Sequence, residues 1–307
     1  MRMIVVGLGI QGRKRIAVAG SDVVATVDPV VPDARYRRVE DVPIGDYDAA
    51  MVCTPESAKI PIVEYLLSSG KHVLVEKPLL PADASEISAV QSLARSRNVA
   101  CYTAYNHRFE PNIARLKSLL DQRVIGSVYL AKLHYGNGTA RDFRNSPWRD
   151  KGLGVVSDLG SHLLDLTDFL FGQKKRDYSV SCLNRFENNA YDHAILISRD
   201  GLPVIELEMS LVSWKNTFRI DVIGELGSLH VGGLCKWGPN TLRIRKRIFP
   251  SGRPEEEIER VDGPDPTWGM EYRHFQSLCA GAGSAPPAGT NLDNDVWIHS
   301  ILNGIST

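Results

Sequence analysis

A lysine in this sequence stands where an alcohol or a carbonyl could react. Lys77 follows the apolar run His72–Val75 in the string Glu76-Lys77-Pro78. If this run is a strand of an open α/β sheet, Lys77 lies at its carboxyl end, where such sheets bind ligands. An ammonium there stabilises the alkoxide that develops during oxidation of an alcohol, and it polarises the carbonyl in the reverse reaction. The alternative is a solvent-exposed lysine that pairs with Glu76.

A histidine is the second candidate, in a string that also holds two aspartates. Asp158, His162 and Asp165 are spaced i, i+4 and i+7, which predicts that they share one face of a helix. His162 can take up and return a proton near neutral pH, and Asp158 can orient a substrate hydroxyl or raise the basicity of the imidazole. Leucines fill the other faces of this helix. The alternative is therefore a buried helix whose histidine and aspartates satisfy one another.

A glycine motif near the start of the sequence, Gly7-Leu8-Gly9-Ile10-Gln11-Gly12, lies between an apolar run and a helix-like stretch. Gly7 permits a tight turn, Gly9 allows the backbone to approach a pyrophosphate, and Gly12 lets the helix pack closely on the strand. The helix N-terminus then offers unpaired N–H groups to the anion. The motif predicts a dinucleotide site, and a glycine turn without a ligand is the alternative.

Asp28 indicates which dinucleotide would bind. It lies 21 positions after Gly7, at the end of the second apolar run. A carboxylate there accepts hydrogen bonds from ribose hydroxyls and disfavours a 2′-phosphate, so we expect NAD rather than NADP. Arg35, Arg37 and Arg38 are the opposing observation, because one of them could fold back and hold that phosphate. The alternative for Asp28 is an ordinary turn residue at a strand end.

Five short apolar runs in the first hundred residues alternate with stretches of helical periodicity, such as Ala84–Arg97. Runs that are apolar throughout are typical of strands buried on both faces, and their alternation with helices predicts a parallel, doubly wound α/β sheet. We therefore expect an N-terminal Rossmann dinucleotide-binding domain over residues 1–105. The five predicted strands are residues 4–6, 23–27, 49–52, 72–75 and 100–104.

The order of elements changes after residue 105. Between Tyr178 and Phe249 the chain consists mostly of predicted strands with short turns, which indicates a mostly antiparallel sheet. We therefore expect a C-terminal α/β domain over residues 106–307. Its other predicted elements are helices over Pro111–Asp121, Asp158–Phe171, Arg273–Ala280 and Asp295–Ile305, and a strand over Val128–His134.

Composition excludes several classes of protein. Lysine and arginine number 36 together, as do aspartate and glutamate, which argues against a main role in binding nucleic acid or an anionic membrane. The five cysteines are scattered and odd in number, so we expect reduced thiols and no metal site. No apolar stretch approaches the roughly 18 residues of a membrane span. We expect a cytoplasmic protein whose partner is a small molecule.

The motifs together resemble the glucose–fructose oxidoreductase/inositol dehydrogenase/MocA family. The resemblance rests on the glycine turn, on Glu76-Lys77-Pro78 and on the string Asp158-x-Gly160-x-His162-x-x-Asp165. It covers nearly the whole chain, and the motifs occur in the family's order. Further segments similar to the family are Val52–Pro55, Gly70–Val73, Tyr105–Phe109 and Trp148-Arg149.

The resemblance implies an NAD-dependent dehydrogenase or reductase that acts on a carbinol carbon of a sugar, a polyol or a sugar-nucleotide. Lys77 and His162 would be the catalytic pair, and Asp158 would orient the substrate or relay a proton. The second domain would carry a large open sheet that forms the interface of a homo-oligomer, a dimer or a tetramer. Thr54, Pro55, Glu76, Asn106 and Arg108 would join the glycine motif, Asp28 and Lys77 in binding the cofactor, and Tyr105, Trp148 and Arg149 would join Lys77, Asp158 and His162 in binding the substrate.

Two residues depart from the family pattern. The family often has three glycines before the aspartate string, and here the middle one is Leu153. The family often has a histidine five residues after the threonine of the Thr-Pro pair, and here this residue is Lys59. The first departure affects the shape of the substrate pocket, and the second affects the details of cofactor binding.

Two other functions use the same motifs. An enzyme with tightly held NAD could oxidise a sugar transiently, to epimerise it or to cleave a glycoside, and then return the hydride. A regulator could bind NAD without chemistry, although the presence of both Lys77 and His162 argues against this. Formation of NADH with substrate separates the dehydrogenase from both alternatives.

Overall fold

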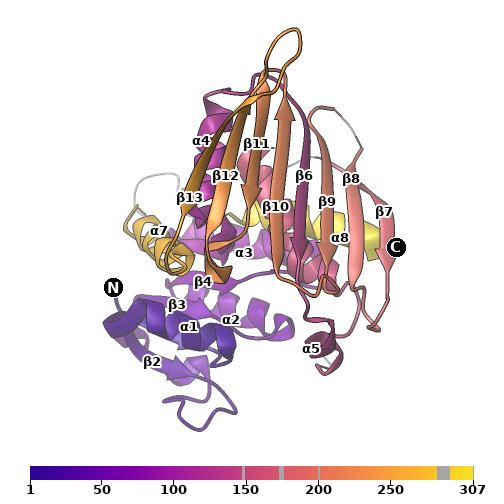
Figure 1. Cartoon of the computed structure of the whole chain (residues 1–307). Helices are drawn as coiled ribbons and strands as arrows, with labels where there is room; N and C mark the ends of the chain where they lie inside the picture. The colour runs from indigo at the N-terminus through magenta and orange to yellow at the C-terminus, as the bar shows by residue number, and fades with distance from the viewer. Residues whose placement is uncertain (147–148, 173–175, 200, 282–290, 307) are drawn as a thin grey trace. The chain divides into compact units, whose positions relative to one another are not determined.

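The computed structural model describes residues 1–307 except 147–148, 173–175, 200, 282–290 and 307 (Figure 1). The chain divides into two compact units. The first comprises Met1–Asn106 and Thr267–His299, and the second comprises His107–Pro266 and Ser300–Thr307. Within the described ranges, no helix is both long enough and apolar enough to cross a membrane.

The first unit is built on a five-stranded parallel sheet in the order β2-β1-β3-β4-β5. Every residue of β1, β3 and β5 is buried, as expected for strands covered on both faces. The predicted Rossmann domain is therefore confirmed, with each strand within one residue of its expected position. The strands are β1 (Met3–Val6), β2 (Val23–Val27), β3 (Ala49–Val52), β4 (His72–Glu76) and β5 (Cys101–Ala104).

Helices complete the first unit. The helix α3 begins with a capping box, in which Asp83 accepts a hydrogen bond from Ser85 N and Glu86 bonds back to the Asp83 N–H. It ends at Asn98 in the left-handed conformation, so local chemistry accounts for both of its ends. The helices are α1 (Ile10–Ala19), α2 (Glu56–Ser68), α3 (Ala84–Arg97), α7 (Thr267–Gly281) and the part of α8 (Leu292–Ser306) up to His299.

The C-terminal helices do not follow the expected division between residues 105 and 106. Helix α7 and the part of α8 up to His299 pack with the first unit. Glu271 of α7 pairs with Arg15 of α1 at 2.7 Å, and Asp295 of α8 accepts a hydrogen bond from Thr103 of β5 at 2.7 Å. Helical periodicity shows that these segments are helices, but it does not show which sheet they cover.

The second unit contains an eight-stranded sheet in the order β13-β12-β11-β10-β6-β9-β8-β7, visible edge to edge in Figure 1. All neighbouring pairs are antiparallel except β6 and β9, so the predicted mostly antiparallel sheet is confirmed. Burial alternates along β10, which shows that one face of the sheet is covered. The strands are β6 (Val128–Gly136), β7 (Tyr178–Asn184), β8 (His193–Ser198), β9 (Val204–Ser210), β10 (Thr217–Gly224), β11 (Gly227–Gly232), β12 (Asn240–Lys246) and β13 (Glu255–Val261).

The helices of the second unit pack against this sheet, α4 on β11 to β13 and α6 on β6. The helix predicted from Asp158 begins differently in the structure. Val156–Gly160 forms a π-helical turn, η5, and only then does α6 begin. The helices are α4 (Pro111–Asp121), α5 (Ala140–Arg144) and α6 (Ser161–Phe171), with short turns η4 (Asn106–Phe109) and η6 (Cys235–Trp237).

Candidate active site

The predicted cofactor residues of the first unit gather at one edge of its sheet. Gly7 follows β1, Asp28 follows β2, Thr54 follows β3 and Lys77 follows β4. Since all these strands are parallel, their carboxyl ends share one edge, which is where open α/β sheets bind ligands. Thr54 Oγ1 is buried there and has no hydrogen-bond partner within the described ranges.

The turn from β1 to α1 requires its glycines. Gly7 has a φ of +92°, and a Cβ on it would lie 2.7 Å from the Cys53 carbonyl oxygen. A Cβ on Gly12 would lie 1.9 Å from the Gly7 carbonyl oxygen, whereas a Cβ on Gly9 would meet nothing within 4 Å. Gly9 is also the N-cap of α1 and has no side chain to cap the first N–H groups, including those of Ile10 and Gln11. The open space at Gly9 and the uncapped helix end fit a pyrophosphate.

Asp28 binds the same turn. Its carboxylate accepts hydrogen bonds from Leu8 N at 2.8 Å and from Val30 N and Val31 N at 2.9 Å each. Burial alone would raise the pKa of Asp28, but these backbone hydrogen bonds lower it, so the carboxylate is ionised at neutral pH. Three of its four acceptor positions are used, and one remains for a ribose hydroxyl. Asp28 is thus both a turn residue and a candidate cofactor residue.

The arginines near Asp28 have partners of their own. Arg35 donates to the Val24 carbonyl at 3.2 Å, Arg37 donates to the Val31 carbonyl at 2.7 Å, and Arg38 pairs with Glu40 at 3.3 Å. To hold a 2′-phosphate, one of these side chains would have to exchange a contact in the structure for the phosphate.

Glu76 and Lys77 end β4, and the Lys77–Pro78 bond is cis. The Glu76 carboxylate lies 2.7 Å from the guanidinium of Arg15, which also pairs with Glu271 at 2.7 Å and stacks on Trp268. This pairing uses a residue of α1 that the sequence did not single out. Glu76 therefore supports the position of the strand end that precedes Lys77.

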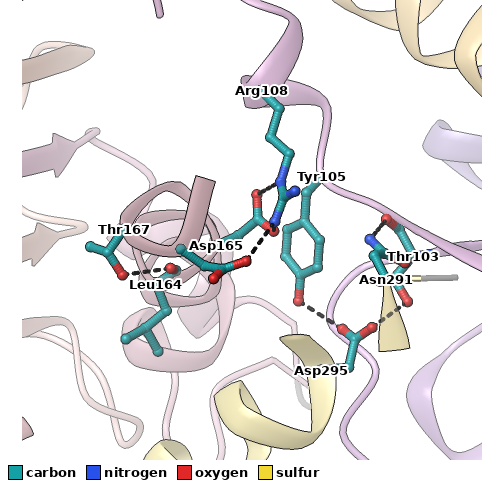
Figure 2. Close-up of polar contacts among 9 residues, drawn as sticks. Thr103, Tyr105, Arg108, Leu164, Asp165, Thr167, Asn291 and Asp295 are labelled. Carbon is teal, nitrogen blue, oxygen red and sulfur yellow. Dashed lines mark hydrogen bonds and ion pairs between the residues drawn. The ribbon is translucent and has the colours of Figure 1, made fainter. Parts of the chain in front are cut away.

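The residues after β5 are also engaged within the first unit. Tyr105 is fully buried and donates a hydrogen bond to Asp295 at 3.1 Å (Figure 2). Asn106 donates to Thr267 Oγ1 at 2.9 Å. The structure thus gives both residues contacts to the C-terminal helices.

In the second unit, the segment before His162 is shaped by two glycines. Gly152 and Gly154 have φ values of +59° and +52°, and a Cβ on Gly154 would lie 2.2 Å from the Tyr191 carbonyl oxygen. Leu153 between them has no positive φ. The position where the family's middle glycine is replaced therefore places no demand on backbone conformation, and leucine fits there.

The two aspartates that flank His162 bind two different arginines. Asp158, in the π-helical turn, pairs with Arg149 at 3.2 Å. Asp165 forms a bidentate pair with Arg108, at 2.6 and 2.8 Å (Figure 2). The sequence predicted one regular α-helix through Asp158 and His162. This prediction is wrong, because Asp158 lies in a π-helical turn and α6 begins only at Ser161. Trp148, expected beside Arg149, lies outside the described residues.

His162 lies in an aromatic cluster that the sequence did not reveal. Its ring stacks on that of His107, with centroids 4.0 Å apart and planes 17° from parallel. The ring of Tyr135 lies 6.1 Å from that of His162, and the Tyr135 hydroxyl accepts a hydrogen bond from Lys236 at 2.8 Å. Burial, with the charges of Asp158 and Glu110, raises the pKa of Tyr135, so its phenol is protonated at neutral pH.

No local signal marked these additional residues. His107 was part of a segment that resembles the family, but Tyr135 and Lys236 come from strand and turn segments with ordinary patterns. Tyr135 lies near His162 because α6 packs on β6, and Lys236 reaches Tyr135 from η6.

Comparison with known proteins decides the family. Residues 1–105 match the model of an oxidoreductase family with an NAD-binding Rossmann fold, and residues 113–230 match the GFO/IDH/MocA C-terminal domain. The chain belongs to the GFO/IDH/MocA family of oxidoreductases. The predicted family is thus confirmed over both domains.

Individual relatives are more distant. Trans-1,2-dihydrobenzene-1,2-diol dehydrogenase of Oryctolagus cuniculus is 28% identical over 213 residues, which are 69% of this chain and 64% of that protein. This chain spans 34% to 65% of the length of the first three curated relatives that it matches.

Solved structures share the fold at lower identity. A protein described as an NADPH-dependent oxidoreductase, from Desulfitobacterium hafniense, has a TM-score of 0.82 at 15% identity, covering 98% of this chain and 93% of that one. Levoglucosan dehydrogenase in complex with NADH has a TM-score of 0.80 at 18% identity, covering 100% and 96%. These similarities establish the fold over the length of the chain.

Proposed function

We propose that this protein transfers a hydride between NAD and a carbinol carbon of a sugar, a polyol or a sugar-nucleotide. The observation that carries the proposal is the edge of the first sheet. There the turn that fits a pyrophosphate, the ionised Asp28 and Lys77 follow strands β1, β2 and β4 of one parallel sheet. A dinucleotide site next to an amine is what oxidation of an alcohol requires.

Separate residues would bind the cofactor, stabilise the substrate oxygen and transfer the proton. Bound NAD supplies a hydride acceptor, and the glycine turn, Asp28, Thr54 and Asn106 would hold it. Lys77 stabilises the negative charge that develops on the substrate oxygen. His162 removes the hydroxyl proton during oxidation and returns it during reduction.

The neighbours of His162 support its role as a base. The stacked His107 restricts rotation of the imidazole, since a tilt would separate the two rings. Asp158 is partly buried and pairs with Arg149 at 3.2 Å, which holds it in a position from which it can orient a substrate hydroxyl. Arg149, which pairs with Asp158, would bind the substrate next to it.

The names of two relatives support the substrate class. One is a dehydrogenase of a cyclic diol, and another is levoglucosan dehydrogenase. The two similar structures do not agree on the cofactor, since one is described as NADPH-dependent and the other contains NADH. Asp28 and the occupied arginines beside it favour NAD for this chain.

The test is turnover with a panel of polyols, sugars, sugar-nucleotides and cyclic diols, followed by NADH absorbance. With a substrate found in this way, we expect Lys77→Met and His162→Ala each to lower kcat by at least about 10²-fold while the Kd for NAD is preserved. His193→Ala, on β8 and outside the site, is the matched control and should keep its turnover.

Three results would count against the proposal. Near-normal kcat in either variant would remove the residue from the mechanism. Conversion of a sugar without accumulation of NADH would show transient oxidation instead, and NAD binding without any turnover would indicate a regulator.

A further inference from the structure

The first turn of α2 holds the loop that follows Lys77. The Lys59 side chain is buried, and its ammonium lies 2.8 Å from Glu56 Oε2 and donates a hydrogen bond to the Pro78 carbonyl oxygen. Glu56 Oε1 accepts a hydrogen bond from Leu80 N at 2.6 Å. One side-chain pair on α2 therefore binds both a carbonyl and an amide of the same loop.

This contact fixes the chain directly after Lys77. The residue before it, Glu76, pairs with Ala104 in the sheet and with Arg15 through its side chain. The residue after it is Pro78, whose carbonyl Lys59 binds. The backbone of Lys77 is thus held on both sides, by the sheet before it and by α2 after it.

The same helix turn adjoins the cofactor residues. Pro55 is the N-cap of α2, so Thr54 and Pro55 run directly into the turn that contains Glu56 and Lys59. A shift of this turn would move the predicted cofactor segment and the loop after Lys77 together. The position occupied by Lys59 is also one where the sequence departs from the family pattern.

We propose that Lys59, with Glu56, is a positioning residue that sets the placement of the Lys77 ammonium for hydride transfer. The inference rests on the proposed function, because it assumes that Lys77 acts on the substrate. A displacement of about 1 Å in a catalytic group can lower a rate by about 10²-fold, so a buried clamp next to such a group affects turnover. A clamp that only stabilised the fold would change stability and leave turnover intact.

The other end of β4 provides a matched control. Lys71 precedes the strand, donates a hydrogen bond to the Tyr47 carbonyl at 2.7 Å and lies over the Tyr47 ring. Like Lys59, Lys71 donates a hydrogen bond from its ammonium to a backbone carbonyl near β4. It lies at the amino end of the strand, away from the edge where Lys77 is found.

The experiment compares Lys59→Met with Lys71→Met, through kcat, KM, the Kd for NAD and Tm. We expect both variants to lose thermal stability, and only Lys59→Met to lower kcat, by about 10- to 10²-fold, with the Kd for NAD preserved. Glu56→Gln, a milder change at a partly exposed side chain, should lower kcat less and covers the case in which Lys59→Met does not fold.

A double variant decides whether the effect passes through Lys77. In Lys59→Met/Lys77→Met we expect the kcat of Lys77→Met alone, because a misplaced ammonium has no effect once the ammonium is absent. Multiplicative losses would overturn the inference, as would wild-type kcat in both Lys59→Met and Glu56→Gln. If Lys77→Met itself keeps wild-type turnover, the proposed function fails. If Lys77→Met is impaired and Lys59→Met is not, only this inference fails.

Discussion

Each unit of the molecule supports its proposed catalytic residue with an arginine held between two carboxylates. In the first unit, Arg15 bridges Glu76, which precedes Lys77, and Glu271 of α7. In the second unit, Arg108 bridges Asp165 and Asp168, on the helix that carries His162. Both arrangements pair one guanidinium with two carboxylates. They differ in the burial of the arginine and in the sequence separation of the paired residues.

Depth separates the two networks. The side chain of Arg15 is 1% exposed and that of Arg108 is 19% exposed. Burial alone would lower the pKa of Arg15, but the charges of Glu76 and Glu271 raise it, so the guanidinium remains charged. The carboxylates are buried in both networks, with Glu271 and Asp165 each 0% exposed, so the difference lies in the guanidinium groups, of which only that of Arg108 is within reach of water. A buried ion pair therefore costs more to break than a partly exposed one.

The largest expected effect follows from this difference. Arg15→Met leaves two buried carboxylates without their guanidinium, and we expect the free energy of unfolding to fall by about 3–5 kcal/mol. Arg108→Met should cost about 1.5–3 kcal/mol, the range for hydrogen bonds to charged groups. Urea unfolding followed by circular dichroism measures both values.

Arg15→Lys is the control for charge. It keeps the positive charge and loses the planar fork that reaches both carboxylates, so its loss of stability should be smaller than that of Arg15→Met. Equal costs for Arg15→Met and Arg108→Met would show that burial does not distinguish the two networks.

The sequence separation of contacting residues also determined what could be predicted from the sequence. The strand β2, the helices α3 and α4 and the glycine turn were predicted to within a residue, because apolar runs, caps and turn glycines are local signals. Arg15 and Glu271 lie far apart in the chain, and no local pattern links them. The network that supports Lys77 was therefore invisible until the fold was known.

The start of α2 shows a second limit. In the sequence, apolar periodicity becomes clear only from Ile60, but the helix begins at Glu56. The omitted turn holds Glu56 and Lys59, two charged residues whose contacts are made with Pro78 and Leu80. Hydrophobic periodicity does not register a turn that is buried through polar contacts. The π-helical turn before α6 was missed for another reason, because its buried residues Val156 and Leu159 are apolar and do not distinguish a π-helical from an α-helical turn.

A smaller effect on kcat is expected from the aromatic ring that stacks on His162. His162 has an aromatic neighbour, His107, in addition to the helix that carries it. A stacked aromatic pair is worth about 0.5–1.5 kcal/mol, so we expect His107→Ala to lower kcat by about two- to tenfold. His107→Phe keeps a flat ring and should retain most of the activity. Steady-state kinetics with the substrate and NAD measure both.

The pair of variants also distinguishes packing from charge. If His107→Phe is as impaired as His107→Ala, stacking is not the contribution, and a hydrogen-bonding or electrostatic role of His107 takes its place. Comparison of the two kcat–pH profiles then identifies the change, because an altered charge near His162 would move the pH at which turnover begins to fall.

An effect of similar size is expected at the cofactor edge of the first unit. Asp28→Asn removes the negative charge that disfavours a 2′-phosphate. We expect the ratio of kcat/KM for NAD over NADP to fall about tenfold, which corresponds to about 1.4 kcal/mol, the scale of a pair of near charges in a well-solvated site. The measurement is kcat/KM with each cofactor at fixed substrate.

Stability against pH separates the two roles of Asp28. Its pKa is lowered in the folded protein by hydrogen bonds from Leu8, Val30 and Val31. The ionised group therefore contributes stability that is fully present above its unfolded pKa and is lost as the pH falls through the folded pKa. Asp28→Asn should be less stable than the parent at neutral pH, and the gap should close in acid. If this gap appears while the cofactor ratio stays unchanged, Asp28 serves the turn alone, and the preference for NAD must come from another residue.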